Sequence, residues 1–123
     1  MNRTESSARS AAALAGERGR VGSLDDVAGA DAVINATSVG MGGTGELPLD
    51  PTGLRAGQLV VDIVYHPLVT PLLEVAEARG ATTLDGLGML VHQAARAVEL
   101  WTGHRPDPVA MRRAALTELA TRS

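Results

Sequence analysis

The sequence predicts an α/β fold built on a parallel β-sheet. Short apolar segments, rich in β-branched residues, alternate along the chain with longer helical segments. A parallel sheet whose strands are joined by crossover helices produces this alternation. We expect the core to be aliphatic, because the 123 residues include no phenylalanine, one tyrosine and one tryptophan.

The first part of the chain is predicted to contain a helix and a buried strand. The helix is alanine-rich, with Thr4 as its N-cap and Gly19 as its end. The segment DAVINA is a short apolar run, which is typical of a strand buried in a parallel sheet. The predicted elements are a helix over 6–18, a short strand over 20–22, a helix or turn over 23–30 capped by Ser23, and a strand over 31–36.

The second part of the chain contains the clearest strand and the longest helix. The segment QLVVDIV is rich in β-branched residues, which favour strands. Two helices begin with a polar cap followed by proline, a pattern typical of helix starts. The predicted elements are a loop over 37–57, a strand over 58–64, a helix from Pro71 closed by Gly80, a strand over 81–84, a helix over 86–102 ended by Gly103, and a last helix from Pro108 to about Ala120.

The composition argues against several classes of function. A net charge of −3 gives no support for binding nucleic acid or an anionic membrane. No apolar run approaches the roughly 18 residues of a membrane span, and the polar start carries no export signal, so a cytoplasmic location is expected. The chain has no cysteine, which excludes disulfides and thiolate chemistry. All 11 basic residues are arginine, so a mechanism that needs a lysine cannot run on this chain alone.

A glycine-rich segment, GMGGTG at residues 40–45, matches the dinucleotide-binding pattern G-x-G-x-x-G letter for letter. That pattern has meaning only where a strand turns directly into a helix. Here Pro48 and Pro51 follow, which rules out a regular helix. The segment is therefore predicted to be a surface loop. The 3 histidines show no metal-ligand spacing, and no metal site is expected.

Two groups of polar residues lie where an α/β sheet would meet a nucleotide. Asn2, Arg3 and Thr4 precede the first helix, where a guanidinium could hold a ribose 2′-phosphate. The alternative is an ordinary solvated helix start. The segment NATS at residues 35–38 follows a buried strand, at the edge where open sheets bind ligands. The alternative is a polar turn that satisfies its own backbone.

Two further groups lie later in the chain. Asp62 and Tyr65 end the clearest strand. Asp62 is either a loop-fastening or an active carboxylate, and Tyr65 is either a ligand contact or a half-buried packing residue. Gly86, Met89 and Gln93 share one face of the long helix at spacings of three and four. They either face a flat ligand, which a bare glycine would let approach, or pack against a neighbouring element.

Taken together, these groups resemble the shikimate dehydrogenase family, and the resemblance covers nearly the whole chain. The residues that carry it occur in the family's order: Asn2 to Thr4, Asn35 to Met41, Asp62 to Tyr65 with Pro67, Thr70 and Pro71, Asp85 to Ala95, and Trp101 to Gly103 with Pro106. The helix block, DGLGMLVHQAA, is the most diagnostic of them.

The resemblance implies NADP as cofactor, and shikimate or 3-dehydroshikimate as substrate, in aromatic amino-acid biosynthesis. It assigns Asn2, Arg3 and Thr4 to the adenosine 2′-phosphate. It also places Thr37 and Ser38 beside the cofactor, Ile63 by the nicotinamide ribose, Gly86 and Met89 at the nicotinamide, and Tyr65 and Gln93 at shikimate. The fold it implies is a partial Rossmann-like parallel sheet, strands three to six of the doubly wound domain, with flanking helices.

The chain departs from the family pattern at its start. Members begin with a substrate domain that carries a catalytic lysine and aspartate, followed by a glycine-rich pyrophosphate loop, all upstream of the position of Asn2. We therefore expect residues 1–105 to form an incomplete NADP-binding domain and residues 106–123 a carboxy-terminal helix. No catalytic residue is expected within this chain, which by itself is expected to be inactive.

Two alternatives stay open at this stage. One is a quinate or other shikimate-like dehydrogenase. The other is a non-catalytic remnant that binds nucleotide weakly or packs on a partner chain. Because the strands that would precede it in a complete domain are missing, the strand over 31–36 is expected to expose an apolar edge through which the chain can self-associate.

Overall fold

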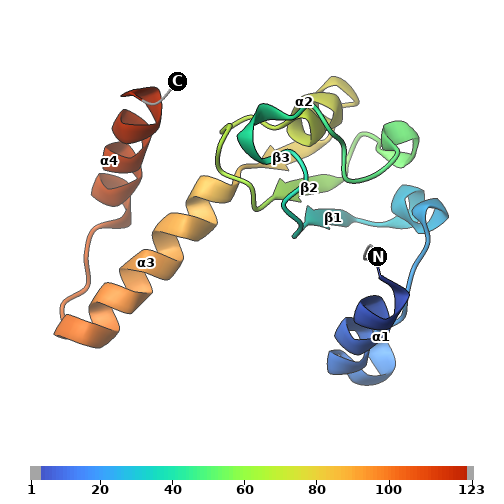
Figure 1. Cartoon of the computed structure of the whole chain (residues 1–123), viewed down its shortest axis with the longest axis horizontal. Helices are drawn as coiled ribbons and strands as arrows, with labels where there is room; N and C mark the ends of the chain where they lie inside the picture. The colour runs from blue at the N-terminus through green and yellow to red at the C-terminus, as the bar shows by residue number, and fades with distance from the viewer. Residues whose placement is uncertain (1–3, 122–123) are drawn as a thin grey trace.

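The structure is a computed structural model that describes residues 4–121. Its centre is a three-stranded parallel sheet in the order β1-β2-β3. The strands are β1 (Ala32–Asn35), β2 (Leu59–Asp62) and β3 (Thr82–Leu84). Figure 1 shows the sheet at the middle of an elongated molecule, with helices on both sides of it. The predicted α/β fold with a parallel sheet is confirmed.

Helices account for most of the remaining chain. Thr70 caps α2, because its Oγ1 accepts the Leu73 N–H at 3.4 Å, and Gly103 ends α3 with a left-handed φ of 71°. No helix within the described range is both long and apolar enough to cross a membrane. The α-helices are α1 (Glu5–Leu14), α2 (Pro71–Ala78), α3 (Gly86–Thr102) and α4 (Pro108–Thr121), and short 3₁₀ turns lie at Gly16–Arg18, Leu24–Gly29, Met41–Gly43 and Pro51–Gly53.

Two predictions for the first part of the chain are wrong. The helix predicted over 6–18 ends at Leu14, because Gly16 adopts a left-handed φ of 58° and the chain continues as a 3₁₀ turn. The strand predicted over 20–22 does not form. A strand needs a neighbour for its backbone hydrogen bonds, and β1 is the edge of the sheet on that side among the described residues.

The hydrophobic core lies on one face of the sheet. There α2 packs against β2 and β3, and the Leu24–Gly29 turn closes the end of this layer. Among residues 4–121 the opposite face has no such cover: Ile34 and Leu84, which flank Val61 in register, are 62% and 52% exposed. The core residues are Val27, Leu54, Val60, Leu72, Leu73, Ala76 and Ala81.

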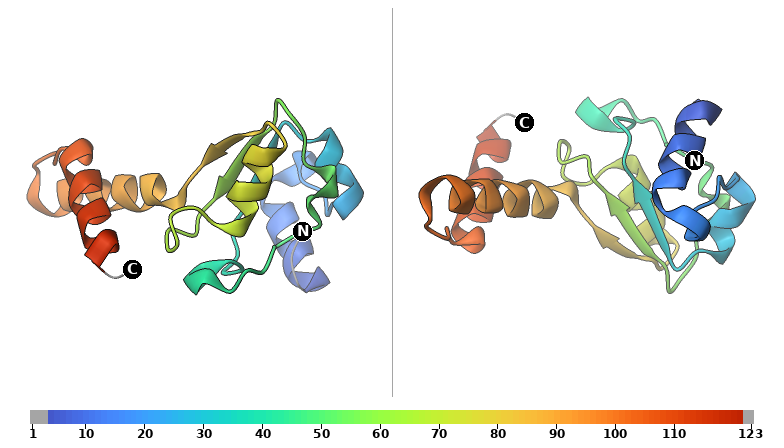
Figure 2. Two further views of the ribbon diagram at one scale, coloured as in Figure 1. Left: turned by 90° about the horizontal axis from the view of Figure 1, so that it is seen from above. Right: turned by 90° about the horizontal axis from the view of Figure 1, so that it is seen from below.

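The two carboxy-terminal helices form a hairpin that extends away from the sheet. Helix α3 leaves the end of β3 and runs outward, and α4 returns beside it (Figure 1). The views from above and below in Figure 2 agree on this arrangement. As a result, only the first turns of α3 face the carboxyl ends of β1 and β2.

Candidate functional site

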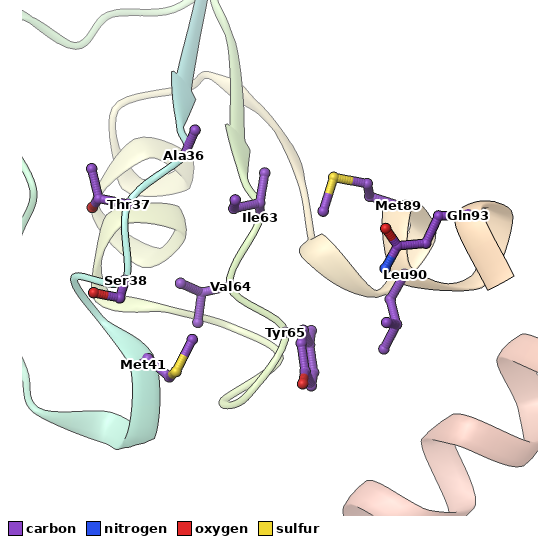
Figure 3. A pocket seen from close by; sticks show the side chains of 10 residues that line it. All are labelled: Ala36, Thr37, Ser38, Met41, Ile63, Val64, Tyr65, Met89, Leu90 and Gln93. Carbon is purple, nitrogen blue, oxygen red and sulfur yellow. The ribbon is translucent and has the colours of Figure 1, made fainter. Parts of the chain in front are cut away.

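A cavity of about 320 Å³ lies at the carboxyl edge of the sheet. Three walls enclose it: the segment after β1, the segment after β2, and the first two turns of α3 (Figure 3). In Figure 3, Met89 and Gln93 extend from α3 toward the segment after β2. The lining residues are Ala36, Thr37, Ser38, Met41, Ile63, Val64, Tyr65, Met89, Leu90 and Gln93.

A buried hydrogen-bond network fixes two of these walls. Asp62 is fully buried at the end of β2, and its Oδ1 accepts bonds from Asn35 Nδ2 at 3.0 Å and from the Val64 N–H at 3.0 Å. Its Oδ2 accepts the Thr70 hydroxyl at 2.7 Å. Because Thr70 also caps α2, one carboxyl group joins the ends of β1 and β2 to a helix start. Asp62 is therefore a loop-fastening residue in this structure.

The polar turn after β1 satisfies part of its own hydrogen-bonding capacity. Asn35 Oδ1 accepts both the Thr37 N–H at 3.0 Å and the Thr37 hydroxyl at 2.7 Å. The Thr37 hydroxyl in turn accepts the Val39 N–H at 3.2 Å. A hydroxyl oxygen can accept two hydrogen bonds, so Thr37 can keep its bonds within the turn and also accept one from a ligand. Ser38 lies exposed beside it on the cavity wall.

Gly86 lies where α3 meets the end of β2. A Cβ placed on this residue would lie 2.2 Å from the main-chain oxygen of Ile63 and 2.6 Å from that of Val64. Such distances are far inside van der Waals contact, so only glycine allows α3 to start this close to β2. The structure thus gives Gly86 a packing role, and Gly86 is absent from the cavity lining. Its predicted contact with a nicotinamide stays a prediction.

Asp85 joins the start of α3 to α4. Its Oδ1 accepts the N–H groups of Leu87 at 3.0 Å and Gly88 at 3.3 Å, which makes it the helix N-cap. Both of its oxygens also accept bonds from the Arg112 guanidinium, at 3.1 and 2.7 Å. The hydrogen bond from Arg112 is the main reason that the pKa of Asp85 lies below its usual value.

A second cavity of about 270 Å³ adjoins the first. It is lined by Met41, Tyr65, His66 and Leu119, so it shares Met41 and Tyr65 with the larger cavity. Tyr65, which is 40% exposed, lines both spaces. Leu119 belongs to α4, so α4 forms one wall of the second cavity.

The structure gathers most of the predicted site residues. Thr37, Ser38, Ile63, Tyr65, Met89 and Gln93 all line the larger cavity. Thr4 is exposed just before α1, caps that helix with no side-chain bond among the described residues, and is not part of the cavity. Asn2 and Arg3 lie outside the described residues.

Sequence reasoning missed four residues of the cavity wall. Ala36, Val64 and Leu90 are apolar neighbours of predicted residues, and periodicity alone gave no reason to separate them from core positions. Met41 was missed because it lies in the GMGGTG segment. That segment forms a loop with a short 3₁₀ turn, held by a 2.9 Å bond from the Gly42 N–H to the His66 carbonyl. The prediction that it starts no regular helix is confirmed.

Comparison with known proteins points to the same family as the sequence motifs. The family profile described as "Shikimate 5'-dehydrogenase C-terminal domain" matches residues 86–116. The chain is 50% identical over 111 residues to the NADP(+) shikimate dehydrogenase of Afipia carboxidovorans, and covers 40% of that protein and 87% of itself. It is 42% identical over 125 residues to the NADP(+) shikimate dehydrogenase of Archaeoglobus fulgidus, and the match covers 46% of that protein and 96% of this chain.

Solved structures show the same similarity. Shikimate 5-dehydrogenase of Thermus thermophilus, in complex with NADP(H) and shikimate, aligns with a TM-score of 0.83 and 39% identity, over 94% of this chain and 44% of that one. Quinate dehydrogenase of Corynebacterium glutamicum, in complex with NAD, aligns with a TM-score of 0.81 and 39% identity, over 91% of this chain and 43% of that one. The chain thus spans less than half the length of these relatives. It belongs to the shikimate dehydrogenase family and matches the carboxy-terminal part of its members.

Proposed function

We propose that this chain supplies the cofactor-side wall of an NADP-dependent shikimate dehydrogenase, which reversibly reduces 3-dehydroshikimate to shikimate. The observation that carries the proposal is the cavity at the carboxyl edge of the sheet. Polar and apolar side chains from the segments after β1 and β2 and from α3 meet there, at the edge where open α/β sheets bind ligands. The relatives named above include an enzyme whose structure holds NADP(H) and shikimate together.

The cavity fits the nicotinamide end of a dinucleotide. Ile63 and Met89 offer apolar surface for a flat ring, and the exposed hydroxyl of Ser38 can bond a ribose or phosphate oxygen. Gly86 lets α3 start against the end of β2, which brings Ile63 and Met89 to the same cavity. The cofactor, when bound, supplies the hydride. The residues of this chain hold and orient it.

The substrate is assigned to the side of the cavity bounded by Tyr65 and Gln93. A phenol and an amide together can donate and accept hydrogen bonds, which suits a polyhydroxylated ring acid. Hydride transfer to a ketone also needs a proton donor, and the chain has no lysine. We therefore propose that Tyr65 and Gln93 orient the substrate, and that the proton is exchanged by a residue of the remaining part of a family enzyme.

The preference for NADP over NAD is assigned to Arg3 with Asn2 and Thr4. A guanidinium can hold a 2′-phosphate through two bonds, whereas a 2′-hydroxyl is usually bound by a carboxylate. Arg3 and Asn2 lie outside the described residues, so support comes from the sequence and from the NADP(+) relatives. A cytoplasmic location stays a prediction of the sequence.

A quinate or shikimate-like dehydrogenase is the second candidate. Its support is the Corynebacterium glutamicum quinate dehydrogenase, whose identity to this chain equals that of the Thermus enzyme. Self-association is a further proposal, supported by the position of β1 at the sheet edge and by the exposure of Ile34.

Titration of the ¹⁵N-labelled chain tests the binding part. NADP⁺ should shift the amide signals of Ser38, Ile63 and Met89, and shikimate those of Tyr65 and Gln93. Gln93→Leu should weaken shikimate binding by roughly 5- to 100-fold, as expected for a lost polar contact, and leave NADP⁺ binding unchanged. The control His92→Ala alters an exposed neighbour on α3 outside the cavity. Absence of any response to either ligand would contradict the proposal.

A chimera tests the activity. In it, this chain replaces the matching carboxy-terminal part of the Afipia carboxidovorans enzyme. The chimera should oxidise shikimate with NADP⁺, and quinate more slowly, whereas the 123-residue chain alone should produce no NADPH above background. Arg3→Ala in the chimera should lower the preference for NADP⁺ over NAD⁺ by roughly tenfold or more. Faster turnover of quinate than shikimate would favour the second candidate.

A further inference from the structure

The Asp85–Arg112 pair connects two helices through one carboxylate. Arg112 lies on α4, and its Nη1 and Nη2 reach the two oxygens of Asp85 at 3.1 and 2.7 Å. The same carboxylate accepts two amides in the first turn of α3, those of Leu87 and Gly88. The guanidinium lies over Gly88, 3.9 Å from where a Cβ would stand. A movement of α4 is therefore transmitted to the first turn of α3.

The opposite side of this turn is fixed by β2. Gly86 contacts the main chain of Ile63 and Val64 too closely for any side chain. The start of α3 is thus held on one side by β2 and on the other by Arg112. The cavity residues Met89 and Gln93 follow within the next two turns.

Helix α4 packs along α3 at the surface of the molecule. None of its residues, from Pro108 to Thr121, is buried, and Val109 is 75% exposed. The Asp85 side chain, in contrast, is only 24% exposed and the Arg112 side chain 37%. A two-pronged pair of this kind fixes orientation as well as distance. Leu119, near the other end of α4, bounds the second cavity beside Tyr65.

We propose that Arg112 is a positioning residue for the cavity. By pairing with Asp85 it sets the first turns of α3, and with them Met89 and Gln93, relative to the ends of β1 and β2. The same pair sets α4, and so the wall of the cavity next to Tyr65. The effect of Arg112 on ligand affinity rests on the proposed function, whereas its effect on α3 does not.

The first test uses the full chain without ligand. Amide hydrogen exchange is measured for residues 87–93, with the β2 amides as internal reference. Arg112→Leu and Asp85→Asn should each speed exchange at 87–93 by roughly three- to tenfold and leave β2 unchanged. Asparagine still caps a helix, so Asp85→Asn isolates the ion pair from the cap. In Arg112→Lys, the exchange rate at residues 87–93 should lie between that of these variants and that of the parent chain.

Arg113→Leu is the matched control, because Arg113 is the adjacent exposed residue on the same helix and the charge change is equal. It should leave exchange at 87–93 unaltered. The double variant Asp85→Asn/Arg112→Leu should exchange at residues 87–93 no faster than either single variant, because each substitution already removes the same ion pair. Unchanged exchange in Arg112→Leu, or an equal effect of Arg113→Leu, would overturn the proposal whether or not the chain binds a dinucleotide.

The second test adds ligands. Arg112→Leu should weaken shikimate binding by roughly three- to tenfold, Arg112→Lys less, and Arg113→Leu not at all. If the parent chain binds neither NADP⁺ nor shikimate, the proposed function fails, and the exchange result still decides the role of Arg112. If the parent chain binds and Arg112→Leu binds equally well, the positioning role is wrong and the proposed function stands.

Discussion

Gly86, the first residue of α3, lies against the main-chain carbonyl of Ile63, the first residue after β2, with no space for a side chain between them. This contact sets the angle at which α3 leaves the sheet. It also places Ile63 and Met89 on two walls of one cavity. Gly86 therefore affects both the stability of the chain and the geometry of the cavity.

Gly86→Ala should destabilise the chain by about 3 kcal/mol, because a Cβ there overlaps the Ile63 carbonyl and forces α3 away from β2. Urea denaturation measures the change. Gly88→Ala is the matched control, since its Cβ would meet nothing nearer than the Arg112 Nη1 at 3.9 Å. It should stabilise α3 by about 0.5–1 kcal/mol. Equal effects of the two substitutions would contradict the assignment.

Gln58→Leu should cost about 2–4 kcal/mol of unfolding free energy. The Gln58 side chain is 1% exposed, and its amide donates to the Val27 carbonyl at 2.7 Å and the Ala30 carbonyl at 2.9 Å. Its oxygen accepts the Arg55 N–H at 2.9 Å. Leucine would remove all three bonds, so the Ala30 carbonyl and the Arg55 N–H would lose these partners, and the Val27 carbonyl would keep only the Ala30 N–H at 3.2 Å. Gln93→Leu, at an exposed position, should change thermal or urea stability by less than about 0.5 kcal/mol.

Thr70→Val should destabilise the chain by about 1–3 kcal/mol. It removes the donor to Asp62 Oδ2 and the cap of α2 at once, while it keeps the volume of the side chain. Thr82→Val is the control, because Thr82 is exposed on β3 and makes no such bond. A Thr70→Val variant as stable as the parent in urea would show that the network around Asp62 has little energetic importance.

The Asp85–Arg112 pair should make the α3–α4 hairpin sensitive to acid. Arg112 holds the pKa of Asp85 below its usual value of about 4, so the stabilisation is complete above that pH. It is lost as the pH falls through the lowered pKa of the folded state, where the carboxylate is protonated. Stability measured from pH 6 down to pH 3 should fall more steeply for the parent than for Arg112→Leu. Parallel curves would contradict this.

Helix α1 should be less protected against amide exchange than α2 and α3. Ala8 is its only buried residue, Leu14 is 91% exposed, and no strand forms between α1 and the sheet. Amides of residues 6–21 should therefore exchange far faster than those of β2 or α3. Mass spectrometry of the labelled chain, with a check of its association state, measures this. Strong and uniform protection of residues 6–21 in a monodisperse monomer would show that α1 needs no further partner.

The sequence by itself determined the elements whose causes are local. The Thr70-Pro71 and Asp107-Pro108 starts and the left-handed glycine after α3 placed three element boundaries. The β-branched run over 58–64 located β2, which is shorter in the structure, Leu59–Asp62. The order of motifs along the chain also identified the family, and named six residues that line the cavity. Each boundary signal and each motif lies within a few neighbouring residues, and the order of the motifs is read directly along the chain, so these features could be found without the fold.

The tertiary structure alone decided the features that depend on distant neighbours. A strand over 20–22 failed to form because β1 is the sheet edge on that side, and strand formation depends on a partner. Gly86 proved to be a packing residue because Ile63, 23 positions earlier, occupies the space beside it. The pairing of Asp85 with Arg112, 27 positions apart, depends on how α4 folds back along α3. No local pattern encodes these distances, because they are set by the packing of elements that are separate in the sequence.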